Sequence, residues 1–283
     1  KLRTHRYGDI GIKEPVIMDT TNVFSKNLAT YISSGVRTIV NKGGTRSSKT
    51  WSILQLLYII ARESKIPRTI SVVSETMPHL KRGCIKDFRK MLELDGLWDD
   101  NAWNATDFKY QVGQSTIEFF SADTPGKVTG PAREILYINE CINVPFDIYR
   151  QLSSRTGEKI ILDYNPLYEF WVDSKVLPRE DTVLIHSTYK DNDMLPAAQI
   201  AEIEYQGSID DNYYRVMILG ETGSYEGMII KNWDIVPGLP PRDTWKKHWI
   251  GVDFGWSAPT AIMLVVQGEG GEVWIDEIAY GRN

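Results

Sequence analysis

The sequence predicts an α/β fold with a mostly parallel central sheet. Before about residue 180, short β-branched runs typical of buried strands alternate with longer apolar runs typical of helices. Strands that alternate with helices favour a parallel sheet with helices on its faces. The composition allows such a fold, because hydrophobic residues make up 42% of the 283 residues, enough for one large domain or two ordinary ones.

Each element of this sheet domain has its own signal. The first strand runs into a Gly-Gly turn, and the helix after it has apolar residues too dense for a surface helix. A second buried strand and an amphipathic helix follow, then a hairpin around Gly113 and two strand-like runs that end in polar residues. In chain order, these elements are expected at 37–44, 49–64, 68–75, 79–94, 109–122, 133–140 and 158–166.

The character of the chain changes after about residue 180. A polar helical stretch over 197–221, which we expect to be broken at Gly207, has the composition of a lid or connector. A Pro-rich linker then leads into three further strand-like runs. The runs lie at 248–255, 260–267 and 272–280. The predicted organisation is a sheet domain at 1–180, a connector at 181–237, a linker at 238–247 and the start of a second domain at 248–283.

The bulk properties argue against several classes of protein. A net charge of −5 argues against a generally basic nucleic-acid coat protein, although it allows a local basic groove. Cys84 and Cys141 are far apart and form no metal pattern, so a reduced intracellular setting is the default. No run approaches the roughly 18 apolar residues of a membrane helix. The N-terminus lacks both a signal-peptide pattern and a starting methionine, which indicates a trimmed sequence.

The stretch GGTRSSKT, residues 43–50, has the arrangement that a triphosphate needs. A strand, a Gly-Gly turn and then Lys49-Thr50 at the head of a helix bring together backbone N–H groups, a lysine charge and a magnesium-binding hydroxyl. Ser48 stands where a glycine is usual before the lysine, which reduces backbone freedom there. Taken alone, the loop therefore fits both a phosphate-binding loop and a polar turn.

Two later strands end in residues that such a loop would use. Asn139 and Glu140 end the strand at 133–140, where a nucleotide-hydrolysing site needs a polar residue for hydrated metal and a carboxylate for water. Asn139 replaces the usual aspartate and brings no charge. Asn165, in LDYNP, ends the next strand; it is either a turn signal or a sensor of the phosphate state. The strand ends shift the balance toward a working nucleotide site.

Several stretches then follow one another in an order that is more specific than any one of them. They are GGTRSSKT, VVSETMPHLKRG, GKVTGPAREILYINE, ILDYNP, TYKDNDML, YYRVMILGETGSYEGMI and WIGVDFGWSAPTA. In this order they resemble the large terminase subunit of tailed bacteriophages, the motor that packages DNA into a procapsid. The resemblance covers roughly residues 22–283, and an Asn-Glu pair in place of Asp-Glu is a variant that some terminases share.

The resemblance implies a P-loop NTPase domain followed by the start of an RNase H-like nuclease domain. It assigns phosphate binding to Lys49, Mg²⁺ binding to Thr50 and contact with the terminal phosphate to Arg46. The implied nucleotide-binding residues are Gly43, Gly44, Thr45, Arg46, Ser47, Ser48, Lys49 and Thr50.

The resemblance also assigns roles to the strand ends. Glu140 would be the catalytic carboxylate, Asn139 would occupy the metal-shell position and Asn165 would belong to the coupling motif. A ring motor further needs a cation from a neighbouring subunit. Arg133 and Lys127, just before the strand that carries Glu140, are the candidates, and an ordinary surface charge is the alternative for each.

The first strand after the linker carries a second implied activity. Asp253, in GVDFG, resembles the first metal-binding aspartate of an RNase H-like nuclease that uses Mg²⁺ or Mn²⁺. Two-metal cleavage needs several carboxylates around ions about 4 Å apart. The acids that follow are Glu269, Glu272, Asp276 and Glu277, and the family's other ligands come later than Asn283. We therefore expect the nuclease to be truncated and inactive in this chain.

The implied cofactors are ATP and Mg²⁺, and the implied partners are double-stranded DNA, the portal of the procapsid and the small terminase subunit. A homo-oligomeric ring on the portal, in the host cell cytoplasm and away from any membrane, is also expected. Basic residues between 79 and 90 either line a DNA channel, which would make binding salt-dependent and sequence-blind, or form a solvated helix face, the safer interpretation.

Three other functions stay open at this point. A helicase would carry further nucleic-acid motifs after the sheet, where this chain has a linker and Asp253. A nucleotide-binding module without turnover is favoured by the departures at Ser48 and Asn139. A plain nuclease with a vestigial loop is disfavoured by the incomplete carboxylate set.

Overall fold

The computed structural model describes residues 3–4, 18–123, 128, 130, 132–223, 236–254 and 260–281. The chain divides into two compact units, Lys1–Glu226 and Gly227–Asn283.

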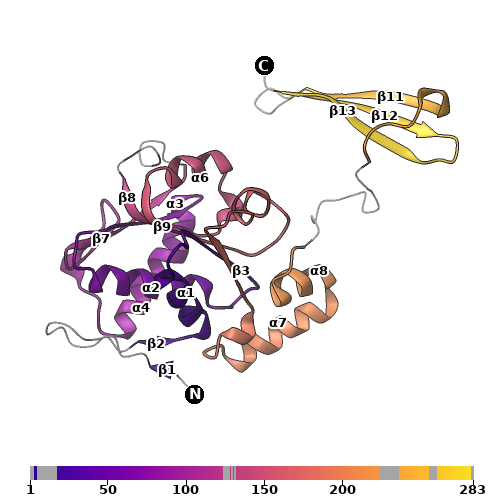
Figure 1. The fold of residues 1–283 in the computed structure, drawn as a ribbon. Coiled ribbons are helices and arrows are strands. Elements are labelled where there is room, and N and C mark those ends of the chain that lie inside the picture. The colour runs from indigo at the N-terminus through magenta and orange to yellow at the C-terminus, as the bar shows by residue number, and fades with distance from the viewer. Residues whose placement is uncertain are drawn as a thin grey trace. The chain divides into compact units, whose positions relative to one another are not determined.

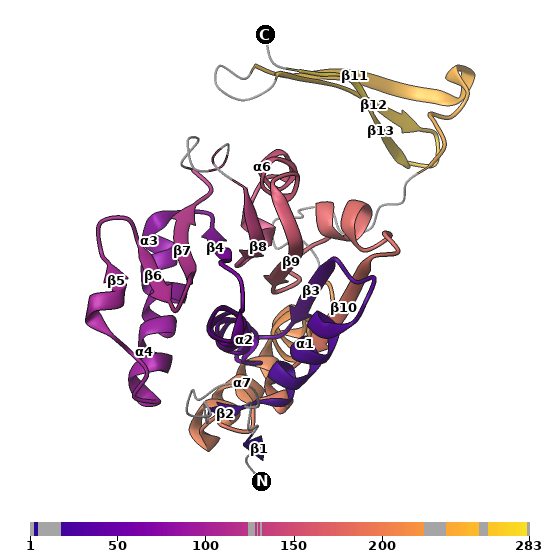
Figure 2. The same cartoon turned by 60° about the vertical axis from the view of Figure 1, so that its left-hand side comes forward.

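The first unit, drawn from indigo to orange in Figure 1, is built on an eight-stranded sheet. Its strand order is β10-β3-β9-β8-β4-β7-β6-β5, and Figure 2 labels each of these strands. From β10 to β7 all neighbours are parallel, and β6 and β5 form an antiparallel edge. The strands are β3 (Thr38–Gly43), β4 (Thr69–Ser74), β5 (Trp103–Asn104), β6 (Lys109–Val112), β7 (Ser115–Ser121), β8 (Arg133–Ile138), β9 (Thr156–Tyr164) and β10 (Thr182–Ser187). The prediction of a mostly parallel α/β sheet is confirmed. A short antiparallel pair, β1 (Arg3–Thr4) and β2 (Asp19–Thr20), precedes it.

Helices cover both faces of this sheet (Figure 2). Adjacent residues of a strand point to opposite faces, so Ile39 packs in one apolar cluster and Val40 in the other. Helices α1 (Asn22–Ile32), α2 (Lys49–Glu63) and α4 (Lys86–Leu94) contribute to the first cluster, and α6 (Phe146–Ser153) contributes to the second. Burial on both faces explains why these strands are nearly continuous apolar runs.

Helical features of the sheet domain also differ from the prediction. α1 begins within a stretch that has no clear periodicity, and it starts at Asn22 because the Thr21 hydroxyl accepts a hydrogen bond from the N–H of Phe24. α6 was also not predicted. The amphipathic helix expected at 79–94 consists of α3 (Met77–Leu80), a π-helical turn (Lys81–Ile85) and α4.

The sheet domain extends beyond residue 180, where the predicted connector began. β10 pairs in parallel with β3, residue for residue from Thr182 opposite Thr38 to Ser187 opposite Gly43. The strand was missed because several of its side chains are exposed or half-buried at the sheet edge. The connector therefore begins after Ser187.

The connector consists of α7 (Ala197–Ile209), α8 (Asp211–Tyr213) and a π-helical turn (Tyr214–Leu219). The predicted break at Gly207 is wrong, because α7 continues through it and ends at the cap residue Asp210. A Cβ atom at Gly207 would lie 2.2 Å from the Ile218 side chain, so this glycine allows the two helical segments to pack closely.

The second unit contains a three-stranded antiparallel sheet in the order β11-β12-β13. Its strands are β11 (Trp245–Asp253), β12 (Thr260–Gly268) and β13 (Val273–Gly281), which confirms the three predicted strands. β11 begins inside the predicted linker. Nuclease character for this unit stays a prediction. Among the described residues, no helix combines the length and apolar character that crossing a membrane requires.

Candidate functional site

The loop GGTRSSKT connects the end of β3 with the start of α2, at the carboxyl edge of the parallel sheet. Both glycines are required by close backbone approaches. A Cβ atom at Gly43 would lie 2.1 Å from the Ser187 carbonyl oxygen, and one at Gly44 would lie 2.3 Å from that of Met217. The end of β10 and the connector therefore pack directly against the loop.

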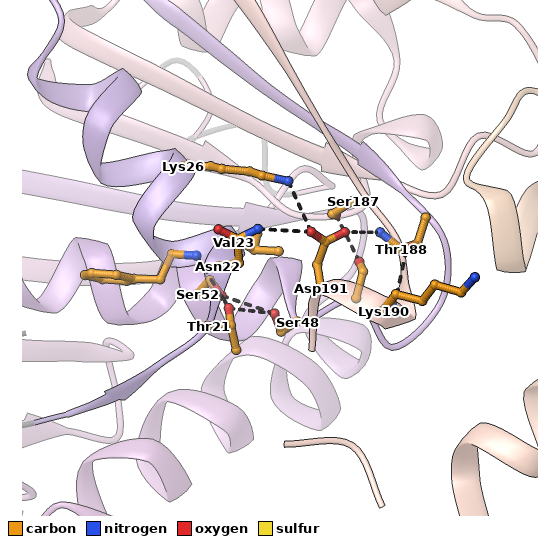
Figure 3. A network of polar contacts seen from close by, with 12 residues as sticks. Thr21, Asn22, Val23, Lys26, Ser48, Ser52, Ser187, Thr188, Lys190 and Asp191 are labelled. Atoms are coloured by element: carbon orange, nitrogen blue, oxygen red, sulfur yellow. Dashed lines mark hydrogen bonds and ion pairs between the residues drawn. The ribbon is translucent and has the colours of Figure 1, made fainter. Parts of the chain in front are cut away.

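Ser48 has the left-handed backbone conformation for which a glycine is usual, with φ 66° and ψ 13°. Such a conformation costs a residue with a side chain roughly 1–2 kcal/mol. The Ser48 hydroxyl lies 2.9 Å from that of Thr21, which in turn lies 2.9 Å from that of Ser52 (Figure 3). These contacts hold the serine in place, so the loop keeps its shape without the glycine.

Lys49 is buried inside the loop that it follows. Its ammonium has three hydrogens to donate and lies within hydrogen-bond distance of the carbonyl oxygens of Gly43 (3.0 Å) and Gly44 (2.8 Å) and of the side-chain oxygens of Ser47 (3.2 Å) and Asn165 (2.9 Å). Burial lowers the pKa of Lys49 to about 8, although the charges of Asp163 and Glu140 oppose the shift. A cation is thus held at the head of α2, where the helix also attracts anions.

The end of β8 lies next to this loop, as the sequence predicted for Asn139 and Glu140. Asn139 is buried, and its amide nitrogen lies 3.4 Å from the Thr50 hydroxyl and 3.1 Å from the Asp163 carboxylate. Glu140 has a left-handed backbone, with φ 50°, and a half-exposed side chain. Its carboxylate lies 3.3 Å from His79 Nε2.

Asp163, on β9, is a site residue that the sequence analysis missed. Only 2% of it is exposed, and its carboxylate accepts hydrogen bonds from the Thr50 hydroxyl (3.0 Å), the Glu140 backbone N–H (2.8 Å) and the Asn139 amide. Burial raises its pKa, against the opposing charge of Lys49 and these hydrogen bonds. The available signal is an aspartate inside the apolar run of LDYNP, two residues before Asn165.

A cavity of about 610 Å³ opens beside these groups. This volume is within the range of small-molecule and cofactor sites, roughly 300–1,000 Å³. Loop residues 45–50 line the cavity together with strand-end and connector residues. Among the latter are Glu140, Asp163, Asn165 and Asn192.

Arg46 and Asn165 both contact residues at or near the connector. The Arg46 residue lines the cavity, and its carbonyl oxygen accepts a hydrogen bond from Asn192 Nδ2 (2.9 Å). Asn165 contacts Lys49 on one side and the Met217 sulfur, at 3.5 Å, on the other. The predicted coupling residue therefore touches both the loop and the connector.

Of the two candidates for a trans-acting cation, the structure describes only Arg133. Lys127 lies outside the described residues. Arg133 begins β8, at the end of the strand opposite to Glu140, and is 2% exposed. Its guanidinium donates to the Ser71 hydroxyl (2.9 Å) and to the Leu152 carbonyl oxygen (3.2 Å). This buried arrangement ties β8 to its neighbours and does not present Arg133 to another subunit.

The start of the connector is also tied to α1. Asp191 accepts hydrogen bonds from the Lys26 ammonium (3.1 Å), the Asn22 amide (3.3 Å) and the Thr188 N–H (2.9 Å) (Figure 3). The next residue, Asn192, is the one that contacts the loop at Arg46. α1, the loop and the connector thus form one polar network.

The donor set around Thr50 fits Mg²⁺. Magnesium sites in proteins use one or two carboxylates together with substrate phosphates and water. The Thr50 hydroxyl and the Asp163 carboxylate are oxygen donors of this kind, and Glu140 lines the same cavity. Within the described ranges, no group of three or more His, Cys, Asp and Glu side chains could hold a metal by itself. A metal here would therefore need further ligands from the phosphates of a bound nucleotide and from water.

Asp253 lies in the second unit, at the end of β11 opposite Ala261. The strand register places Glu277 opposite Met263 and Asp276 opposite Leu264, so the two acids point to opposite faces of the sheet. By this alternation, Glu277 shares a face with Asp253. The metal-binding role of Asp253 stays a prediction.

The basic residues of the segment 79–90 partly have partners within the chain. Lys81 lies over the Phe108 ring, and Arg89 pairs with Glu93 and lies over Trp98. These contacts are those of a solvated helix face.

Comparisons with known proteins give a consistent result. The sequence profile of the phage terminase large subunit family matches residues 36–221. The PBSX phage terminase large subunit of Bacillus subtilis (strain 168) is 22% identical over 228 residues. The match covers 69% of this chain and 51% of that protein, so the chain spans about half the length of this curated relative.

Solved structures of large terminases have the same fold. The large terminase from a thermophilic bacteriophage has a TM-score of 0.64 at 20% identity, covering 91% of this chain and 68% of that one. The complex of the same terminase with ADP has a TM-score of 0.61. The HK97 bacteriophage large terminase has a TM-score of 0.60 at 13% identity, covering 94% and 64% of the two chains.

The parallel sheet, its strand-to-helix loop and these structural matches define a protein of the P-loop NTPase fold class. The family profile covers residues 36–221, which is most of the chain. The chain belongs to the phage terminase large subunit family.

Proposed function

We propose that this chain is the ATP-hydrolysing part of a motor that moves double-stranded viral DNA into a procapsid. The observation that carries the proposal is the convergence of the loop lysine and threonine with the strand-end residues around one cavity. Membership of the terminase family supports the packaging role and DNA as the substrate.

In this proposal, the loop binds the triphosphate of ATP. Backbone N–H groups and the start of α2 attract the phosphates, and Lys49 adds a full charge. Lys49 is ordered by its contacts with the loop carbonyls, so it loses little side-chain entropy on binding. Arg46, which lines the same cavity, contacts the terminal phosphate.

Mg²⁺, when bound, would neutralise charge on the β- and γ-phosphates. Thr50 would hold it at the head of α2, beside the polar ends of β8 and β9.

Glu140 orients and deprotonates the attacking water. Its half-exposed carboxylate faces the cavity, and the contact with His79 restrains one of its oxygens. Its strained backbone is stabilised by the hydrogen bond from its N–H to Asp163.

Asn165 relays the phosphate state to the connector. It contacts Lys49 in the loop and Met217 in the connector, so a movement of the lysine toward phosphate changes both contacts. The connector, which comprises α7, α8 and the turn Tyr214–Leu219, is then the element that moves.

The wider roles are proposed from family membership. They include a homo-oligomeric ring at the portal in the host cell cytoplasm, a small terminase subunit as partner, and a cation donated between subunits. Asp253 would be a ligand for Mg²⁺ or Mn²⁺ in a nuclease that cuts concatemeric DNA.

Steady-state ATP hydrolysis with Mg²⁺, with and without double-stranded DNA, tests the proposal. Lys49→Ala and Glu140→Gln should each reduce turnover by about 100-fold or more, because they remove phosphate charge stabilisation and the base for water. Glu140→Gln should still bind ATP. Turnover by Glu140→Gln at the native rate would contradict the assignment of the catalytic carboxylate.

Nucleotide binding without hydrolysis would leave two explanations. Repeating the measurement with portal-bearing procapsids separates them, since a motor that lacks its partners would then hydrolyse ATP. Continued inactivity would favour a nucleotide-binding module, in line with the missing charge at Asn139.

A further inference from the structure

We propose that Asp163, rather than Asn139, supplies the carboxylate that holds the Mg²⁺ shell at the head of α2. The inference rests on the proposed function, because it concerns the same nucleotide site. It identifies a metal-site residue on β9, in place of the one expected on β8.

The amide of Asn139 is turned the wrong way to replace a carboxylate. Its Nδ2 group, a donor, lies 3.1 Å from the Asp163 carboxylate, 3.3 Å from the Tyr137 hydroxyl and 3.4 Å from the Thr50 hydroxyl. A carboxylate accepts and never donates, so the neighbouring Asp163 fixes this orientation. Asn139 therefore directs the positive end of its amide dipole at Thr50 and Asp163.

The contact between Thr50 and Asp163 prepares the hydroxyl for a cation. The hydroxyl donates its only hydrogen to Asp163 Oδ2, at 3.0 Å, and one of its two lone pairs faces the donor Asn139 Nδ2, at 3.4 Å. Because Asp163 accepts this hydrogen, the lone pairs of the Thr50 oxygen point away from Asp163. The carboxylate thus orients Thr50 as a metal ligand and adds the negative charge that the site otherwise lacks.

The burial of Asp163 is consistent with a cation partner. It is 2% exposed, and its three hydrogen-bond donors are a hydroxyl, an amide and a backbone N–H, all of them neutral. A buried carboxylate is costly unless it is paired or coordinates a metal. Lys49 offsets some of this cost by its charge, while its hydrogen bonds go to the loop and to Asn165.

The sheet order explains why β9 can provide this group. β9 lies between β3, which leads into the loop, and β8, which carries Asn139 and Glu140. Asp163 pairs with Asn41 of β3, and Leu162 pairs with Ile138 of β8. Asp163 is therefore close to Thr50 and to the Glu140 N–H at the same time.

The same geometry explains the asparagine. Two carboxylates about 3 Å apart do not both ionise readily, so a site with Asp163 in this position is better served by an amide at 139. The pair carries one charge, placed on β9.

The test measures how much Mg²⁺ strengthens the binding of ATP-γ-S, by calorimetry of the full chain in Mg²⁺ and in EDTA. Asp163→Asn should reduce the Mg²⁺-dependent gain in affinity by about 10-fold or more, as expected for groups that support metal ligands. Affinity in EDTA should change little. Mn²⁺ in place of Mg²⁺ gives an independent readout, the electron paramagnetic resonance spectrum of the bound ion.

Two further variants control for structural effects. The exchange variant Asn139→Asp/Asp163→Asn keeps one carboxylate in the pair and should recover most of the gain. Asp147→Asn removes an exposed carboxylate on α6 and should behave as the native chain does. Circular dichroism and thermal melting verify that each variant is folded.

The outcomes separate the two proposals. An unchanged Mg²⁺-dependent gain in Asp163→Asn would overturn the assignment of Asp163 and leave the nucleotide site intact. An equal loss of affinity in Mg²⁺ and in EDTA would mean that Asp163 supports the shape of the loop and not the metal, which also overturns it. Failure of the native chain to bind ATP-γ-S in either buffer would overturn the proposed function, and this inference with it.

Discussion

At the residue scale, Ser48 and Glu140 both have left-handed backbones, with φ of 66° and 50°, although neither is glycine. Such conformations persist where the surroundings hold them, and they are frequent at functional sites. At Ser48 the restraint is the hydroxyl network with Thr21 and Ser52, and at Glu140 it is the hydrogen bond to Asp163. Side chains therefore hold the shape that a glycine would adopt freely.

The Ser48 restraint can be tested by comparing Ser48→Gly with Ser48→Ala. Glycine removes about 1 kcal/mol of left-handed strain and loses a hydroxyl contact of similar size, so its unfolding free energy should stay within about 1 kcal/mol of native. Alanine keeps the strain and loses the contact, and should be about 1 kcal/mol less stable than native. Urea unfolding measures both. An alanine variant as stable as native would show that the contact with Thr21 contributes nothing.

The sequence indicated most of the residues that the structure brings together around the cavity, but not all of them. Lys49, Thr50, Asn139, Glu140 and Asn165 carry local signals, because each stands at the end of a recognisable strand or the start of a helix. His79 carries no such signal, and the only signal at Asp163 is that an aspartate stands inside an apolar run. Their roles depend on which strands are neighbours in the sheet. The order β3-β9-β8-β4 results from contacts between distant segments, so no local sequence pattern predicts it.

At the element scale, the elements buried on both faces were predictable and the edge elements were not. β3, β4, β8 and β9 have dense apolar runs because helices cover both of their faces. β10, at the edge of the sheet, has a mixed pattern. α1 depends on tertiary contacts with α2, which periodicity does not record.

The tie between α1 and the connector gives a prediction for Asp191→Asn. The variant keeps an acceptor but loses the charge that faces Lys26 and the Thr188 N–H, and should lose about 1 kcal/mol of stability at pH 7. Burial favours a higher pKa for Asp191, but these hydrogen bonds outweigh it, so the pKa lies below its usual value.

The sign of that shift fixes the pH dependence. A carboxylate with a lowered pKa stabilises the fold above its unfolded-state pKa, about 3.9, and the contribution is lost as the pH falls through the folded-state value. The native and Asp191→Asn chains should therefore differ equally at pH 7 and pH 5, and converge only below about pH 4. Urea unfolding at several pH values measures this pH dependence.

Lys26→Gln is the matched control and should cost less stability, because Lys26 is 41% exposed. A difference that already shrinks between pH 7 and pH 5 would contradict the assignment.

At the scale of the whole molecule, the proposed nucleotide site and both apolar clusters lie within Lys1–Glu226. The three-stranded sheet of the second unit contributes none of the residues that line the described cavity. The proposed nucleotide binding should therefore belong to the first unit alone.

This division predicts the behaviour of a chain that ends at Glu226. It should unfold in one cooperative transition, because its core is complete, and it should bind ATP-γ-S within about threefold of the affinity of the full chain, a difference of less than 1 kcal/mol. Calorimetry and urea unfolding measure the two properties, and Lys49→Ala in both lengths provides the control for binding at the loop. A large loss of affinity in a folded short chain would mean that the second unit takes part in the nucleotide site. An equal loss from Lys49→Ala in both lengths would instead place all of the binding energy that depends on Lys49 within the first unit.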